Sequence, residues 1–381
     1  LMGKSKDLAE LAGVTSRLDT LGASSGSLSN RNLIANGSCI IAQRGASSTT
    51  NGYGSVDRFQ TLYSGTDEAP TQAQVDVASG TTPYTLGFRK ALRITNGNQT
   101  SGAGAADYLG TFYRIEGQDI SSSGWNTTDP NSKLTLSYWV KSSVAQTFYG
   151  RFRAFASDQY EYTYSFALSA NTWTKVTKTI PGNSNFSSLV NTNAIGFFHV
   201  WQCFWGTDYT NNKTLDAWAV KDNANKSPDM TSTWYTTNDA TFEITGCQLE
   251  VGSQSTDFEW EPTGITLAKC ERYFQTYSKR NWQGTNEHAA NYYMYCDGVF
   301  RQKMRAAPTA TFVGTITIGR PQVGVSQRPN EISGLSSQGF LGFKWPTSGT
   351  YGGQLGTHGD TYYRMYVGDG PTNRLDFDAE L

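Results

Sequence analysis

The chain has 381 residues, more than one hydrophobic core usually serves, so the sequence predicts at least two folded units. Charged residues make up 17%, and 31 basic against 32 acidic side chains leave a net charge of −1. Without a basic stripe, nucleic acid is not an expected partner. No apolar run is long enough to insert into a membrane. The five cysteines contain no C-x-x-C pair, so neither a disulfide framework nor a structural zinc is expected.

The composition favours sheets and turns. Aromatic side chains reach 13% and glycine supplies 39 positions, with Ser, Thr and Asn filling much of the rest. Tyr, Trp, Phe and Thr suit a pleated, half-buried surface, while Gly and Asn suit tight turns that need a positive φ. The sequence therefore predicts an all-β protein with helix only near the two ends of its main body.

The first expected element is a short amphipathic helix in an N-terminal stem, residues 1–30. Its apolar side chains recur at the 3-4-3 spacing of a coiled-coil seam, namely Leu11, Val14, Leu18 and Leu21. So short a helix is not stable alone, so copies of the chain are its expected partner, and packing on its own domain is the alternative. The Gly- and Ser-rich segment 22–27 resembles a flexible linker and favours the coiled coil.

Residues 31–263 show the alternation of a β-sandwich. Over Tyr160–Leu168, aromatic or aliphatic side chains occupy every second position, as on a strand with one buried face. Over Ile195–Trp205 both faces are apolar, which is typical of a central strand covered on both sides. The apolar parity switches at Gly246, and such a switch predicts a β-bulge.

Two further segments complete the expected organisation. Residues 264–278 predict a short linking helix, and residues 279–381 predict a second, C-terminal β-sandwich with Gly, Pro and Asn turns. Because about a hundred residues provide a small core, this unit is expected to complete its core across the axis of a homotrimer. The chain begins with Leu1 rather than Met, which favours a fragment of a longer polypeptide.

Eight short blocks occur in order along the chain: Asn32–Gly37 (NLIANG), Ala42–Gly45 (AQRG), Asp57–Phe59 (DRF), Arg114–Gly117 (RIEG), Leu134–Ser143 (LTLSYWVKSS), Ile244–Gly252 (ITGCQLEVG), Leu267–Phe274 (LAKCERYF) and Phe377–Leu381 (FDAEL). Together they resemble a widespread family of bacteriophage tail-fibre proteins. The start and finish of the sandwich are also similar to jelly-roll carbohydrate-binding modules, which open with N-L-x-x-N-G. Those modules often bind a structural calcium through acidic residues of the last strand. Ile244–Cys247 offers none, so neither a metal nor another cofactor is expected.

The resemblance implies a function and partners. It implies a non-enzymatic, homotrimeric receptor-binding fibre of a virion, made in the host cytoplasm and recognising a bacterial surface glycan, lipopolysaccharide or capsule. Other virion proteins would bind through an N-terminal part outside this sequence. Two alternatives stay open: a tailspike that depolymerises its polysaccharide through two carboxylates about 5–9.5 Å apart, and a capsid-attached head fibre of the same domain type.

Aromatic residues in expected loops are the candidate sugar contacts, because sugar rings stack their C–H faces on Trp and Tyr. In the sandwich these are Trp125, Trp205, Tyr209, Trp234 and Tyr235. In the C-terminal unit they are Trp345, Tyr351 and His358. The alternative is that these rings fill the ends of the sandwich as part of its core. No catalytic residue is expected, because the one G-x-S-x-G match, residues 22–26, is neither preceded by a strand nor followed by a helix.

Overall fold

A computed structural model describes residues 30–278, 281–285, 293–297, 300–313, 316–319, 331–333, 340–344, 362–367 and 374–381. The chain divides into two compact units, the first ending at Thr263 and the second comprising Gly264–Glu380. The predicted seam of Leu11, Val14, Leu18 and Leu21 lies outside the described residues. No helix of the described residues is both long and apolar enough to cross a membrane.

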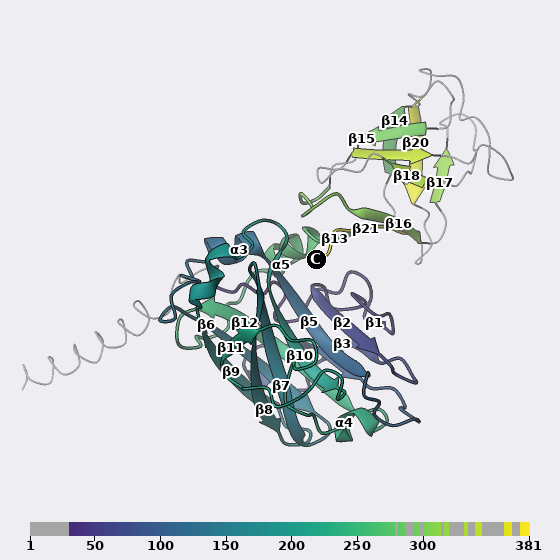
Figure 1. Cartoon of the computed structure of the whole chain (residues 1–381). Helices are drawn as coiled ribbons and strands as arrows, with labels where there is room; N and C mark the ends of the chain where they lie inside the picture. The colour runs from purple at the N-terminus through teal and green to yellow at the C-terminus, as the bar shows by residue number, and fades with distance from the viewer. Residues whose placement is uncertain are drawn as a thin grey trace, which may run out of the picture. The chain divides into compact units, whose positions relative to one another are not determined.

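The first unit is an antiparallel β-sandwich of two six-stranded sheets, seen as two layers in Figure 1. Sheet A has the order β1 (Ser47–Ser48), β3 (Thr71–Asp76), β4 (Lys90–Thr95), β12 (Thr241–Val251), β6 (Lys133–Ser142) and β9 (Thr174–Pro181). Sheet B has the order β11 (Trp218–Val220), β8 (Gln159–Leu168), β7 (Gln146–Phe155), β10 (Ile195–Trp205), β5 (Tyr108–Glu116) and β2 (Phe59–Ser64). The predicted all-β sandwich is confirmed for this unit.

The core lies between the two sheets and is dominated by aromatic rings. Trp201 of β10 and Tyr138 of β6 are fully buried, with ring centroids 5.6 Å apart. The hydroxyl of Tyr164 lies 2.9 Å from Nε2 of His199 and 3.1 Å from the hydroxyl of Tyr138. Burial lowers the pKa of His199 well below its usual range, so this histidine is a neutral member of the core.

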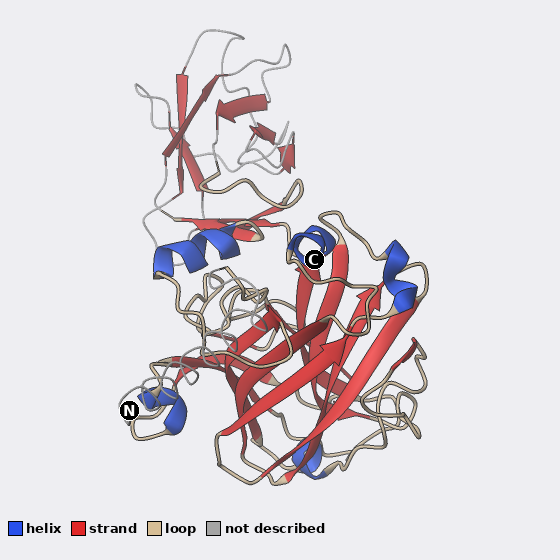
Figure 2. Ribbon diagram, turned by 90° about the vertical axis from the view of Figure 1, so that its left-hand side faces the viewer, coloured by secondary structure: helices blue, strands red, loops and turns tan. Residues whose placement is uncertain are grey.

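Short helices occur at more places than the sequence predicted. Figure 2 shows them in blue beside the red strands. They are α2 (Thr82–Thr85), α3 (Gly117–Ser122), the 3-10 helix η1 (Ser184–Ser188), α4 (Thr233–Thr236) and α5 (Thr263–Glu271). Most are single turns in connections, too short for the periodicity that reveals a helix in sequence. The predicted linking helix ends at Glu271, because Phe274–Tyr277 pairs as strand β13 instead.

The second unit contains two antiparallel sheets. One has the order β13 (Phe274–Tyr277), β21 (Arg374–Asp378) and β16 (Thr309–Val313). The other has the order β17 (Ile316–Gly319), β20 (Tyr362–Val367), β14 (Asn281–Thr285), β15 (Tyr293–Asp297), β19 (Phe340–Lys344) and β18 (Glu331–Ser333). Because β21 lies between β13 and β16, the C-terminal block of the sequence supplies the central strand of the smaller sheet.

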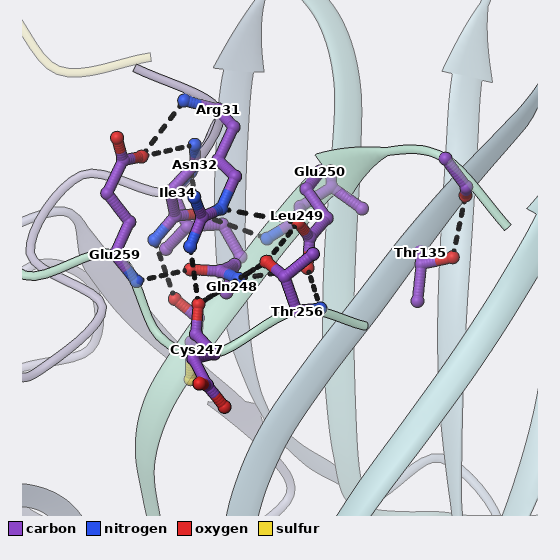
Figure 3. A network of polar contacts seen from close by, with 12 residues as sticks. Arg31, Asn32, Ile34, Thr135, Cys247, Gln248, Leu249, Glu250, Thr256 and Glu259 are labelled. Atoms are coloured by element: carbon purple, nitrogen blue, oxygen red, sulfur yellow. Dashed lines mark hydrogen bonds and ion pairs between the residues drawn. The ribbon is translucent and has the colours of Figure 1, made fainter. Parts of the chain in front are cut away.

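The opening N-L-x-x-N-G block has a structural explanation, shown in part in Figure 3. The side chain of Asn32 accepts from the N–H of Leu249 at 3.0 Å and donates to the carbonyl of Cys247 at 3.1 Å. Glu259 accepts from the N–H of Asn32 at 2.9 Å. At Gly37, a Cβ would lie 2.0 Å from the Cys247 carbonyl oxygen. The block therefore fastens the start of the sandwich to β12, and only glycine fits where the two backbones meet.

The predicted bulge at Gly246 is confirmed. The register between β12 and β6 shifts between Thr245 and Gln248, and Gly246 has φ +62°. A Cβ at this position would lie 2.7 Å from the ring of Phe88. Glycine is required here both by the left-handed backbone and by the close ring.

Candidate functional site

The outer face of sheet B, which is turned away from sheet A, has an apolar cluster of its own. In β10, Phe197, His199 and Trp201 face the core, so the alternating residues Phe198 and Val200 lie on the outer face. The prediction that Ile195–Trp205 is a central strand buried on both faces is therefore confirmed, with identical bounds for β10.

Six aromatic rings form a continuous chain on this face, which we call the aromatic row: Phe155, Phe198, Phe112, Trp205, Tyr108 and Tyr209. Successive ring centroids lie 5.7–6.1 Å apart. Tyr108 and Trp205 are stacked, whereas Tyr209 meets Tyr108 edge to face. Tyr108, Tyr209 and Phe155 are half-buried, so the row presents ring surface at both of its ends.

Basic side chains surround one buried carboxylate beside the row. Glu161 is fully buried and pairs with Arg151 and Arg153, and Lys213 Nζ lies 3.9 Å away. Arg153 also lies over the ring of Phe198, 4.9 Å from its centroid. Two guanidinium groups thus pair with one carboxylate, and Lys213 interacts with both Glu161 and Asp222, so cations predominate immediately around Glu161.

Lys226 extends the positive charge to the far end of the row. Its Nζ lies over the ring of Tyr209, 4.1 Å from the centroid. Partial burial lowers the pKa of Lys226 to about 8, and the charges of Arg151 and Arg153 add to this effect. A fraction of this side chain is therefore neutral near pH 8, and an anion bound beside it would restore the charge.

Two connections carry these residues over the sheet. Lys213 belongs to the β10–β11 connection and Lys226 to the β11–α4 connection. The carbonyl of Lys226 accepts from Oγ1 of Thr163 at 2.8 Å, and the N–H of Asp216 donates to the carbonyl of Thr163 at 2.8 Å. The connections are thus bonded to β8 and fixed beside the row.

A buried amide next to the row lacks partners. Gln202 follows Trp201 in β10, so its side chain lies on the same face as Phe198 and Val200. Both polar atoms of this amide are buried and without a hydrogen-bond partner among the described residues. Because leaving such groups unpaired costs about 1–3 kcal/mol each, a ligand or water that bonded to them would be favoured.

A hollow of about 200 Å³ lies where β10 ends. Phe204 and Trp205 line it together with the 103–105 turn and residues Gly206, Thr207, Thr210, Met230 and Ser232. Rings of this kind bind the C–H faces of sugars, guanidinium and ammonium groups bind carboxylate or phosphate, and amides bind hydroxyls. The row, the cations and the hollow therefore suit a sugar chain that carries acidic groups.

The structure separates the five candidate rings of the sandwich into two groups. Trp205 and Tyr209 belong to the aromatic row. Tyr209 is half-buried, whereas Trp205 has only 3% of its surface exposed and therefore supports the neighbouring rings rather than offering surface itself. Trp125, Trp234 and Tyr235 lie in the core with at most 4% of their surface exposed. In this conformation those three rings offer no surface to a ligand, and they fill the ends of the sandwich. Trp345, Tyr351 and His358 of the C-terminal unit lie outside the described residues.

Several members of the site were missed in sequence. Tyr108, Phe112 and Phe198 lie in strands β5 and β10, whereas the candidates were sought in loops. The double apolar face of β10 was the available signal, because one of its faces had to lie outside the sandwich core. Glu161 stands out in the sequence only as one of the glutamates near aromatic residues, and its burial was not expected, since a carboxylate on the second face of a strand normally faces solvent.

Figure 3 shows the polar network around the last strand of sheet A, where jelly-roll carbohydrate-binding modules often hold a structural calcium. Glu250 is fully buried, and Nε of Arg31 lies 3.4 Å from its carboxylate. Nη2 of Arg31 donates to the carbonyl of Asp257 at 2.6 Å. Among the described residues, no group of three or more His, Cys, Asp or Glu is placed to hold a metal ion. A guanidinium group thus supplies the positive charge that Glu250 requires.

We expect chelation to leave the sandwich unaffected for this reason. Excess EDTA should not change the Tm measured by tryptophan fluorescence, since Arg31 already neutralises Glu250. By contrast, Arg31→Met should lower the Tm, because it leaves a buried carboxylate without its cation. A Tm that fell with EDTA and recovered with calcium would contradict this assignment.

Comparisons with known proteins give limited similarity. No protein-family model and no curated protein matches the chain. Among solved structures, the chain is similar to the enzymatically active domain of tailspike protein 4 of bacteriophage CBA120, with TM-score 0.32 and 10% identity. That alignment covers 58% of this chain and 21% of the tailspike, so the chain spans about a fifth of its length.

Sugar-binding proteins also occur among the similar structures. A family 16 carbohydrate-binding module has TM-score 0.24 and 13% identity, and the alignment covers 47% of this chain and 84% of the module. A putative sugar-binding protein from Bacteroides thetaiotaomicron has TM-score 0.29 and 12% identity, with 58% and 99% covered. All three TM-scores are below 0.5, so these similarities do not establish a shared function.

Proposed function

We propose that this chain is the host-recognising part of a bacteriophage tail fibre, and that it binds an acidic bacterial surface polysaccharide on the outer face of sheet B. The observation that carries the binding role is the aromatic row with the unpartnered Gln202 beside it. Half-buried rings at both ends of the row give a sugar chain several stacking positions. The amide of Gln202 is fully buried, and its donor and acceptor would pair through a water between it and the sugar.

The charge distribution supports an acidic ligand. Arg151, Arg153, Lys213 and Lys226 lie on this face around the buried carboxylate of Glu161, and Asp222 also acts on Lys213. A carboxylate or phosphate group on the sugar would bind the partly exposed Arg153 and Lys226 and be attracted by the buried charges of Arg151 and Lys213. Lipopolysaccharide and many capsules carry such groups, which makes them the proposed ligand class.

The role in a virion is proposed from the eight sequence blocks and from the trimer that the N-terminal seam predicts. Individual sugar contacts are usually weak, and three copies on one axis would raise the avidity if their spacing allows simultaneous binding. Attachment to the tail rather than to the capsid rests on the resemblance alone.

Binding without hydrolysis is part of the proposal. The carboxylate of Glu161 is fully buried and bonded to two arginines, so it does not reach a glycosidic oxygen. Asp107, beside the hollow, accepts the N–H of Gly104 at 2.7 Å. A depolymerase needs a pair of accessible carboxylates on either side of the bond it cleaves. Release of reducing ends from a bound polysaccharide would favour the tailspike alternative.

An array of bacterial lipopolysaccharides and capsular polysaccharides provides the test. The full chain should bind at least one acidic polysaccharide, and Tyr209→Ala should bind it about tenfold more weakly because a stacking ring and the support of Lys226 are lost. Val220→Ala, at an apolar position on β11 that is more exposed than Tyr209, is the control. Binding confined to neutral polysaccharides, or unchanged in Tyr209→Ala, would contradict the proposal.

The pH dependence follows from Lys226. Since its pKa is about 8, the ammonium form that attracts an acidic sugar is lost as the pH rises through this value. Affinity should fall roughly fivefold between about pH 7 and pH 9. Lys226→Met should bind more weakly at pH 7 and lose most of this dependence. If titration calorimetry gave the parent chain and Lys226→Met the same dependence of affinity on pH, Lys226 would not belong to the site.

A further inference from the structure

We propose a second sugar-binding site on the outer face of sheet A, which takes a single neutral pyranose. A hollow of about 340 Å³ lies there, within the size range of small-ligand sites. Its lining includes the aromatic residues Phe88, Trp139, Phe258 and Trp260 and the charged residues Lys175 and Asp257. The hollow belongs to the opposite sheet from the aromatic row, so it does not depend on the function proposed above.

One wall of this hollow is a rigid trio of rings. The centroids of Phe88, Phe258 and Trp260 lie 4.8–5.0 Å from one another. Phe88 is buried against the bulge at Gly246. Gly87 has φ +107°, and a Cβ there would lie 3.0 Å from the indole of Trp260. The backbone is thus shaped to let the indole approach closely, although half of this side chain is exposed to solvent.

Trp139 of β6 also lines the hollow and packs against the small apolar cluster that contains Phe88. It alternates with the core-facing Tyr138 and Val140, which places it on the outer face. Trp139 lines the same hollow as Trp260, and no ring contact joins the two indoles among the described residues. The hollow is therefore lined by two indoles that do not cover each other, and a pyranose in it would bury apolar C–H surface against them.

The exposure of Trp260 indicates that something binds there. Its side chain is 51% exposed and Leu86 is 52% exposed, and both line the hollow. These are two of the four large apolar residues that are most exposed among those described. An apolar pair held open by a fixed backbone costs solvation free energy unless a ligand covers it.

The polar lining indicates a neutral ligand. Lys175 lies opposite Trp139 in the β6–β9 pairing, and Asp257 lies on the other side next to Phe258. Their charges cancel, and the two groups together offer donors and acceptors for sugar hydroxyls. Ser137 adds a hydroxyl from β6. This balance differs from that of sheet B, where cations outnumber the carboxylate, and it disfavours an acidic sugar.

The test is saturation-transfer NMR on the full chain with four neutral sugars as probes, D-glucose, D-galactose, D-mannose and N-acetyl-D-glucosamine, and D-glucuronate as the acidic comparison. At least one neutral sugar should receive saturation, and Trp260→Ala should weaken its binding about tenfold or more. Lys175→Ala should weaken it to a smaller extent. Val220→Ala should retain it, since Val220 does not line this hollow.

Three results would overturn the inference: no transfer to any neutral probe, unchanged transfer in Trp260→Ala, or tighter binding of glucuronate than of the neutral sugars in this site. A change of molar mass by light scattering in Trp260→Ala would do so as well, because it would show that another copy of the chain covers the hollow. Tyr209→Ala should lose polysaccharide binding on the array and still transfer saturation to the neutral monosaccharide. This result would separate the two sites, so that either proposal can fail without the other.

Discussion

Glu161→Gln is expected to destabilise the sandwich by about 3–5 kcal/mol, because it leaves two guanidinium groups beside a neutral amide. Glu161 is fully buried, and Arg151 has 2% of its side chain exposed. Burial already lowers the pKa of Arg151 to about 10, which measures how poorly its surroundings solvate the charge. Removal of the carboxylate withdraws the partner that offsets this penalty.

The measurement is the Tm by tryptophan fluorescence, which reports mainly on the sandwich because eight of the ten tryptophans lie within residues 31–263. A loss of this size lowers the Tm by roughly 10 °C. Asp76→Asn is the matched control, since Asp76 pairs with Lys90 in an exposed ion pair that contributes little. Arg151→Met combined with Glu161→Leu should recover part of the loss. Equal Tm values for Glu161→Gln and the control would refute the buried-pair account.

Trp234→Ala is expected to cost a similar 3–5 kcal/mol, as for other large-to-small changes in a core. The indole is fully buried, and its Nε1 donates to the carbonyl of Thr241 at 3.0 Å. The ring packs near Phe148 and Phe242, both buried in the core, with centroids 6.5 Å away. Its removal leaves a cavity and takes one of two hydrogen bonds from the Thr241 carbonyl, which keeps the N–H of Ser143 at 3.0 Å.

The same substitution should leave glycan affinity unchanged at temperatures where the variant is folded. Tyr209→Ala should show the reverse behaviour, a small loss of stability and a large loss of array binding, since its ring is half-buried at the end of the aromatic row. Melting curves and binding titrations on both variants therefore separate a packing role from a binding role. A Trp234→Ala protein with parental Tm and weakened binding would return Trp234 to the ligand site.

The strands of the sandwich were predictable because apolar side chains recur at every second residue along them. The bounds of β10 and the bulge at Gly246 were anticipated, since a central strand and a switch of parity both leave an apolar pattern. One-turn helices such as α2 and α4 were not, because Thr82–Thr85 and Thr233–Thr236 are shorter than one helical repeat of apolar positions.

The candidate site was predictable only in part. Trp205 and Tyr209 were identified from their loop context, yet the same reasoning selected Trp125 and Trp234, which are buried. Sequence does not distinguish a loop that folds back into the core from one that lies over a sheet, because that choice depends on contacts distant in the chain. The pairing of Glu161 with Arg153 across β7 and β8 likewise becomes visible only with the register.

The most direct test of glycan recognition on sheet B is titration calorimetry with the acidic polysaccharide that binds best on the array. We expect Tyr108→Ala to weaken binding about tenfold, because this ring stacks on Trp205 and contacts Tyr209 at the exposed end of the row. Trp260→Ala, on the opposite sheet, should bind the acidic polysaccharide as the parent chain does. Parental affinity in Tyr108→Ala, with its Tm unchanged, would contradict the assignment of this face as the glycan-binding site.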